Sequence, residues 1–277
     1  MSKKLPSSSV ASSTSSSLGS TPTQTSFDFN GVGIIPVETS SFFTVDFRNP
    51  NNANSILYST SLTACAVVLM KELNEVSGKY DGIVTMAHFY PANAYSSQDA
   101  AKNLKKVIDN FKEKGGTLSP KTSVILIGGA VVEGEDINDT TPLGPLLEVL
   151  NALQRGEGFK FLHHDQSIVR NFSENCCVFA NKDGTAITKK TNRFSASDPI
   201  ALLTKPSASM PAELLTAIAN SGTDFYPEGA KEILNSRIIK ISDIADKTDE
   251  LGRKPSIPIT DMQSLFEKCS KQGSRQL

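Results

Sequence analysis

Short apolar runs separated by polar turns fill the sequence between residues 37 and 189, and this pattern constrains the fold more than any other feature. Most of the runs are too short for a helix and carry many Val, Ile and Phe residues, which favours strands. The predicted strands are residues 37–47, the second half of 59–70, 82–89, 123–132, 159–163, 176–181 and 185–189. A hairpin turn at Lys182-Asp183-Gly184 joins the last two.

Two segments have helical periodicity instead. Residues 99–114 place apolar side chains at helical spacing and stop at Gly115-Gly116, and residues 142–153 form a second apolar helix. We therefore predict an α+β fold, with a β-sandwich-like core of mixed and antiparallel strands flanked by helices.

The two ends of the chain differ from this middle part. Residues 2–26 contain eleven Ser and four Thr and almost nothing apolar, so we predict a disordered tail over residues 1–26. Residues 27–194 are the predicted folded domain. Strand-like runs then stop, and residues 195–277 are expected to be a helical extension, with short helices at 212–220, 228–235, 241–250 and 261–271.

Charge and composition exclude several classes of function. The 28 Lys and Arg nearly balance the 29 Asp and Glu, which argues against nucleic acid as a partner. No apolar stretch approaches the ~20 residues of a membrane-spanning helix, and no apolar region follows Lys3 and Lys4 as in a secretory signal. The four cysteines have no disulfide or zinc spacing, so free thiols in a reducing compartment are expected.

One cysteine and one histidine are predicted to meet. If residues 65–89 form an antiparallel hairpin centred near Val76 and Ser77, Cys65 lies opposite His88. Opposed Cβ atoms are about 4.5–5.5 Å apart, so the imidazole would lower the pKa of the thiol and activate it. A shift of one residue would place the two side chains on opposite faces. The alternative is a buried thiol acting as a small apolar side chain beside a structural histidine.

Several strings in the same order resemble CheD, the chemoreceptor glutamine deamidase. The nucleophile segment of that family is similar to residues 59–69, and its His motif, which ends in Pro, is similar to Met86-Ala87-His88-Phe89-Tyr90-Pro91. The similarity continues through Ala100-Ala101, through Gly128-Gly129-Ala130 at a strand end, and through the hairpin at residues 178–189. It spans roughly residues 35–190.

This resemblance implies a reaction and its residues. The superfamily includes cytotoxic necrotizing factor catalytic domains and Burkholderia lethal factor, which convert a glutamine of a host protein to glutamate. Cys65 would be the nucleophile, His88 the general base and acid, and Ser59, where the family has Thr, would orient the imidazole. Ala64 and Thr60 would border the oxyanion and substrate site. The partner would be a protein with an exposed glutamine, without metal or cofactor.

The resemblance also leaves alternatives open. The Ser-rich tail and the long C-terminal part favour a bacterial effector delivered into a host cell without a cleaved signal peptide over a chemoreceptor deamidase in the bacterial cytoplasm. A non-catalytic binding module of the same fold is the other class, and transglutamination or peptide hydrolysis by the same Cys-His pair is a further one. Outside this region, His163-His164-Asp165 are weaker metal-ligand candidates, Cys176 and Cys177 are predicted core residues, and Gly128-Gly129 are predicted to allow close approach of two backbones.

Overall fold

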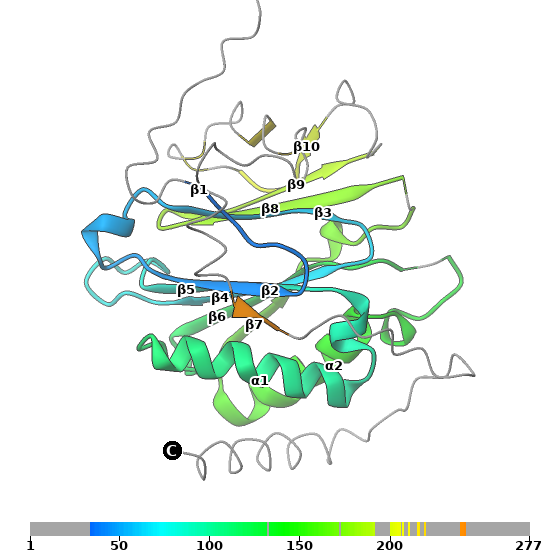
Figure 1. Cartoon of the computed structure of the whole chain (residues 1–277), viewed down its shortest axis with the longest axis horizontal. Coiled ribbons are helices and arrows are strands. Elements are labelled where there is room, and N and C mark those ends of the chain that lie inside the picture. Colours follow the sequence, from blue (N-terminus) through cyan, green and yellow to red (C-terminus); the bar gives the residue numbers. More distant parts are fainter. Residues whose placement is uncertain are drawn as a thin grey trace, which may run out of the picture.

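The structure is a computed structural model of the 277-residue chain. It describes residues 34–131, 133–171, 173–191 and 200–205, together with residues 207, 210, 215, 216, 219 and 239–241. The described part is an α+β fold in three layers, with a five-stranded sheet stacked on a six-stranded sheet and two helices beneath the latter (Figure 1).

Each sheet combines antiparallel pairs with one parallel pair. The five-stranded sheet has the order β1 (Ile34–Pro36), β3 (Ile56–Leu62), β8 (Asn175–Asn181), β9 (Gly184–Lys190), β10 (Ile200–Leu202). The six-stranded sheet has the order β11 (Ile239–Lys240), β2 (Ser41–Asp46), β5 (Ile83–Phe89), β4 (Ala66–Glu72), β6 (Thr122–Gly128), β7 (Lys160–His163). Only β1–β3 and β6–β7 run parallel among these strands.

Two helices cover the outer face of the six-stranded sheet. Helix α1 (Ser97–Glu113) begins after Ser96, whose hydroxyl accepts the Asp99 N–H at 3.2 Å, and it ends before Gly115 with φ +92°. Helix α2 (Leu143–Glu157) ends at Gly158, also in the left-handed region. The short 3-10 helices are η1 (Pro50–Asn52), η2 (Pro91–Ala94), η3 (Ile137–Asp139) and η4 (Asp165–Ser167).

The alternation of side chains along the central strands builds two separate cores. Ala66, Val68 and Met70 of β4 pack toward the helices, whereas Val67 and Leu69 pack into the space between the sheets. Both faces of this strand are therefore buried, which explains its continuous apolar run. A third core lies on the outer face of the five-stranded sheet, where Tyr58 and Phe179 pack near Met210, Leu215 and Ala219.

The predicted α+β fold is confirmed, and so are the two helices, strands β4 to β9 and the hairpin at residues 182–183. Strand β3 was not predicted, and the strand expected over residues 37–47 begins only at Ser41. The expectation that strands stop near residue 195 is wrong, because β10 pairs with β9 and β11 pairs with β2. Residues 1–26 and most of the predicted C-terminal helices lie outside the described residues. Within the described part, no helix is both long and apolar enough to span a membrane.

Candidate active site

Cys65 lies where the chain passes from one sheet to the other. Strand β3 belongs to the five-stranded sheet and β4 to the six-stranded sheet, and only three residues connect them, the last of which is Cys65. The preceding Ser61 has φ +60°, a conformation that costs a non-glycine residue free energy and is often found at functional sites. The short crossing thus fixes the backbone at Cys65.

Gly128 and Gly129, at the end of β6, pass close to the backbone of Cys65, as the sequence predicted. The Gly129 N–H donates to the Cys65 carbonyl at 2.7 Å, and a Cβ on Gly128 would lie 3.0 Å from that same oxygen. Both glycines have φ near +80°, which other residues rarely adopt. The pair therefore holds the main chain that carries the thiol.

This contact gives a stability prediction. Gly128→Ala should lower the free energy of unfolding by about 2 kcal/mol or more, because the left-handed backbone and the approach to the Cys65 carbonyl both oppose a Cβ. Gly134→Ala is the matched control, since Gly134 has φ +88° but nothing within 4 Å of its Cβ position. Equal losses for the two variants in urea unfolding would show that the contact with Cys65 contributes nothing.

His88 points into the space between the sheets and is 3 % exposed. It lies on β5 in the six-stranded sheet, yet its Nδ1 is 2.8 Å from the Ser59 Oγ of β3 in the five-stranded sheet. The Val37 carbonyl lies 3.4 Å from the same nitrogen. The hydrogen bond between Ser59 and His88 that the resemblance implied is therefore present, and it joins the two sheets.

The groups around Nδ1 favour one position for the proton of the neutral ring. The Val37 carbonyl lies 2.9 Å from the Ser59 hydroxyl and 3.4 Å from Nδ1, and because a carbonyl can only accept, we assign the single hydroxyl proton of Ser59 to it. The Ser59 oxygen can then only accept from His88, so Nδ1 carries the hydrogen. This leaves Nε2 as a bare acceptor, and Nε2 is buried without a hydrogen-bond partner. In this tautomer the lone pair of Nε2 is free to accept a proton, as a general base requires.

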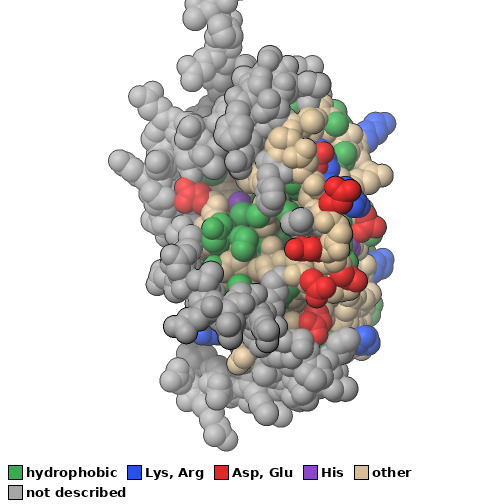
Figure 2. Space-filling view, turned by 90° about the vertical axis from the view of Figure 1, so that its right-hand side faces the viewer, with side chains coloured by type: hydrophobic (Ala, Val, Ile, Leu, Met, Phe, Trp, Pro, Cys, Tyr) green, Lys and Arg blue, Asp and Glu red, His purple; other side chains and the backbone are tan. Residues whose placement is uncertain are grey.

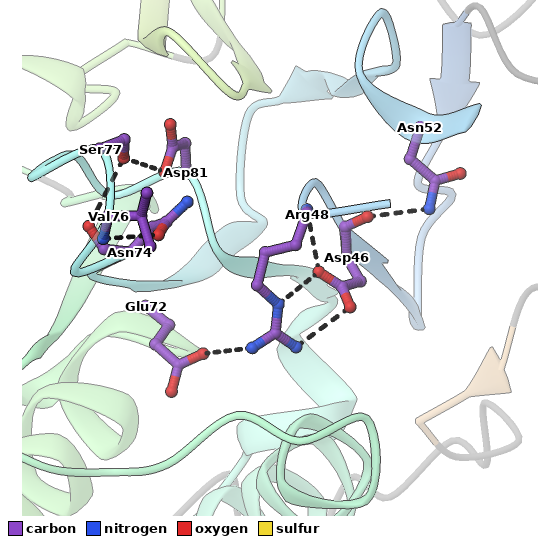
Figure 3. Close-up of polar contacts among 8 residues, drawn as sticks. All are labelled: Asp46, Arg48, Asn52, Glu72, Asn74, Val76, Ser77 and Asp81. Atoms are coloured by element: carbon purple, nitrogen blue, oxygen red, sulfur yellow. Dashed lines mark hydrogen bonds and ion pairs between the residues drawn. The ribbon is translucent and has the colours of Figure 1, made fainter. Parts of the chain in front are cut away.

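The predicted register of the hairpin is wrong, because Val67 rather than Cys65 lies opposite His88. The turn is centred where predicted, with a bridge between Asn74 and Lys79, and Figure 3 shows its Asn74–Val76 and Ser77–Asp81 hydrogen bonds. Lys71 and Val84 form the last pair of the ladder next to this turn. Two residues lie between Lys71 and Asn74, whereas four lie between Lys79 and Val84. The extra pair shifts the ladder by two positions.

A shift of two preserves the face on which a side chain lies. Cys65 and His88 therefore both face the space between the sheets, as diagonal rather than direct neighbours. Diagonal neighbours in a sheet are about 7–8 Å apart, so a hydrogen bond between them needs a local movement. None joins them in the described structure, since Nε2 has no partner.

The electrostatics of the pair also differ from the prediction. Burial raises the pKa of the Cys65 thiol to about 12, rather than the histidine lowering it. Burial likewise lowers the pKa of His88 to about 4, against a weaker opposing effect of the Val37 carbonyl. Both shifts favour a neutral thiol beside a neutral imidazole. A stable thiolate, and with it rapid alkylation of the free protein at mildly acidic pH, is no longer expected.

A pocket of about 240 Å³ opens beside His88. It is lined by Pro36, Val37, Glu38, Thr39, Tyr58, Ser59, Thr60 and His88. On the face drawn in Figure 2, a histidine side chain is visible at a hollow beside an apolar patch, and acidic side chains gather on the other side of that patch. The structure thus brings Ser59, Thr60 and His88 to one pocket, whereas Cys65 and Ala64 do not line it.

The remaining candidates lie outside this pocket. His163 Nδ1 contacts the Asp165 carboxylate at 2.9 Å, and within the described residues no three metal-ligating side chains of His, Cys, Asp or Glu cluster. Cys176 and Cys177 are buried core residues, as predicted, and Cys65, Cys176 and Cys177 are free thiols.

A scan against protein-family models finds no match, and a search of curated proteins finds none either.

Sequence reasoning missed the main-chain groups of the site. The Val37 carbonyl and the Ser40 N–H both contact His88, the latter donating to the His88 carbonyl at 2.9 Å. Every residue supplies a main-chain carbonyl, and every residue except proline supplies a main-chain N–H, so residue type does not indicate these contacts. Both residues fall inside the strand predicted over residues 37–47, so the sequence carried no signal for these contacts.

Proposed function

We propose that this chain is a cysteine-dependent protein glutamine deamidase that acts on a host protein as a bacterial effector. One observation carries the proposal. Ser59 and His88, which the sequence predicted to act together, lie 29 residues apart and in different sheets. Ser59 Oγ and His88 Nδ1 are hydrogen-bonded at 2.8 Å. The bond leaves the basic nitrogen of the histidine free on the sheet face that also carries the candidate nucleophile.

The mechanism follows from the neutral pair. As Cys65 Sγ bonds to the carboxamide carbon of a substrate glutamine, His88 Nε2 takes the thiol proton, and the carbonyl oxygen becomes an oxyanion. Backbone N–H groups near Ala64 and Cys65 would stabilise that oxyanion. The C–N bond then breaks while Nε2–H protonates the departing ammonia, and a thioester remains.

Hydrolysis completes the cycle. His88 Nε2 accepts a proton from water, the resulting hydroxide attacks the thioester carbon, and the C–S bond breaks. The thiolate takes the proton back from His88. The substrate side chain is then a carboxylic acid, which releases its proton to solvent and becomes glutamate, so a neutral amide has become a negative charge.

Ser59 has a positioning role in this scheme. By accepting from Nδ1–H it keeps the proton on that nitrogen and supports the positive charge that the ring carries between the two proton transfers. Thr60, in the same pocket, is placed to contact the substrate chain.

A second function has an observation of its own. Cys65 is 8 % exposed and does not line the pocket beside His88, which suits a binding module whose pocket holds a ligand without chemistry. In that case Cys65→Ala leaves the biological effect of the protein intact.

Mass spectrometry of host-cell proteins separates the two functions. We expect the wild-type chain to convert a specific glutamine of a target protein to glutamate, and Cys65→Ala to leave that glutamine unchanged. Adding a primary amine in a parallel reaction tests for transglutamination, which would attach the amine instead of producing glutamate. Capture of a partner without any change in its mass would contradict deamidation.

A further inference from the structure

Residues 37–40, here called the crossing segment, carry the chain from β1 in one sheet to β2 in the other. The segment contacts His88 at both ends. The Val37 carbonyl lies against the ring nitrogen at 3.4 Å, and the Ser40 N–H donates to the His88 carbonyl at 2.9 Å. It therefore touches both the imidazole and the main chain of His88.

All three polar groups of Ser40 are bonded to different parts of the fold. Besides its N–H, the hydroxyl donates to the Asn93 Oδ1 of η2 at 2.8 Å, and the carbonyl accepts the Ile241 N–H at 2.8 Å. The residue is 2 % exposed and has φ +59°. Such an over-determined, strained backbone position is typical of a place where geometry matters for function.

The Ile241 contact brings a distant part of the chain to the site. Ile241 follows β11, which pairs with β2 at the edge of the six-stranded sheet (Figure 1). Its side chain is fully buried, and its carbonyl accepts from the Lys106 ammonium of α1 at 2.7 Å. A continuous set of hydrogen bonds thus runs from Lys106 through Ile241 and Ser40 to His88.

We propose that Ser40 is a positioning residue for His88. Strand β11 and the following Ile241, whose carbonyl accepts a hydrogen bond from Lys106, hold Ser40 in place. The role of this arrangement in catalysis rests on the proposed function. In physical terms, residues 239–241 set the orientation and burial of the histidine ring through the crossing segment.

The inference is tested by nuclear magnetic resonance of the full chain labelled with ¹⁵N-histidine, in which a His88→Gln spectrum assigns the His88 signals. Ser40→Gly removes the hydroxyl and still accepts a positive φ. We expect it to raise the titration midpoint of His88 by about one pH unit, because a loosened segment admits water. We also expect it to weaken the preference for hydrogen on Nδ1. The variant does not replace the titratable residues around the ring, which are Glu38 in the same pocket and Cys65 on the same sheet face.

Lys106 supplies an independent variant on the surface of α1. Lys106→Met should shift His88 in the same direction, and Lys106→Arg, which retains a donor, should restore the wild-type titration. Lys102→Met makes the same change of charge elsewhere on the exposed side of the helix and should have no effect. An unchanged His88 titration and tautomer in Lys106→Met would overturn the inference, as would an equal shift in Lys102→Met. These readouts need no substrate, so they stand apart from the success or failure of the deamidation assay.

Discussion

Replacing Cys65 with alanine should lower deamidation by at least about a thousandfold, because the thiol supplies the only covalent bond to the substrate in the proposed mechanism. The fold should change little. The thiol is small and mostly buried, and its loss costs about 1 kcal/mol of stability. Initial rates of glutamate formation, measured by mass spectrometry at equal concentrations of folded protein, give the ratio.

Cys176→Ala is the matched control for this experiment. Cys176 is also a buried thiol in the core between the sheets, on β8. Removing it creates a comparable small cavity without touching the proposed chemistry. Near-wild-type rates are expected for Cys176→Ala, and a similar loss in both variants would mean that Cys65 acts through packing alone.

The contribution of His88 should lower the free energy of unfolding by roughly 3 kcal/mol as the pH falls from 6.5 to about 4. Burial lowers the pKa of His88 in the folded chain to about 4, from an ordinary value of 6.5. Well above pH 6.5 the ring is neutral in both states and contributes nothing to the pH dependence. Between the two values the unfolded chain binds a proton that the folded chain refuses, so unfolding becomes easier as the pH falls.

Urea unfolding at a series of pH values measures this effect. A His88→Phe variant has no titrating group at this position, so its stability should depend much less on pH over the same range. Burial also lowers the pKa of His163, which acts in the same direction, so a His163→Gln variant isolates the smaller contribution. A wild-type pH slope in His88→Phe would contradict the assignment of the acid sensitivity to His88.

The structure requires more of the substrate than the sequence suggested. Nε2 is bare, the thiol is protonated, and the pocket with Ser59, Thr60 and His88 does not include Cys65. For deamidation, substrate binding must bring Cys65 Sγ and Nε2 from a diagonal relation into hydrogen-bond distance. Hydrogen bonds between catalytic groups often tighten in this way only when the substrate is bound.

The sequence by itself determined most of the elements and the alternation of side chains along them. Apolar spacing identified helix α1, and an apolar run rich in β-branched residues identified strand β4. The period of two along a strand also meant that Cys65 and His88 would share a face in any register shifted by an even number of residues. Such patterns are local, because each depends on the period of a single element. The same holds for Gly128, whose missing Cβ marked a close backbone approach.

Only the tertiary structure decided which groups meet across that face. The extra residues before β5 set the register, and the packing of two sheets brought Ser59 to His88. The Val37 carbonyl and the Ser40 N–H are main-chain groups that every sequence supplies, and the strand at Ile239–Lys240 is too short to carry a periodic signal. Contacts of this kind depend on how far-apart segments are folded together, and no single segment encodes them.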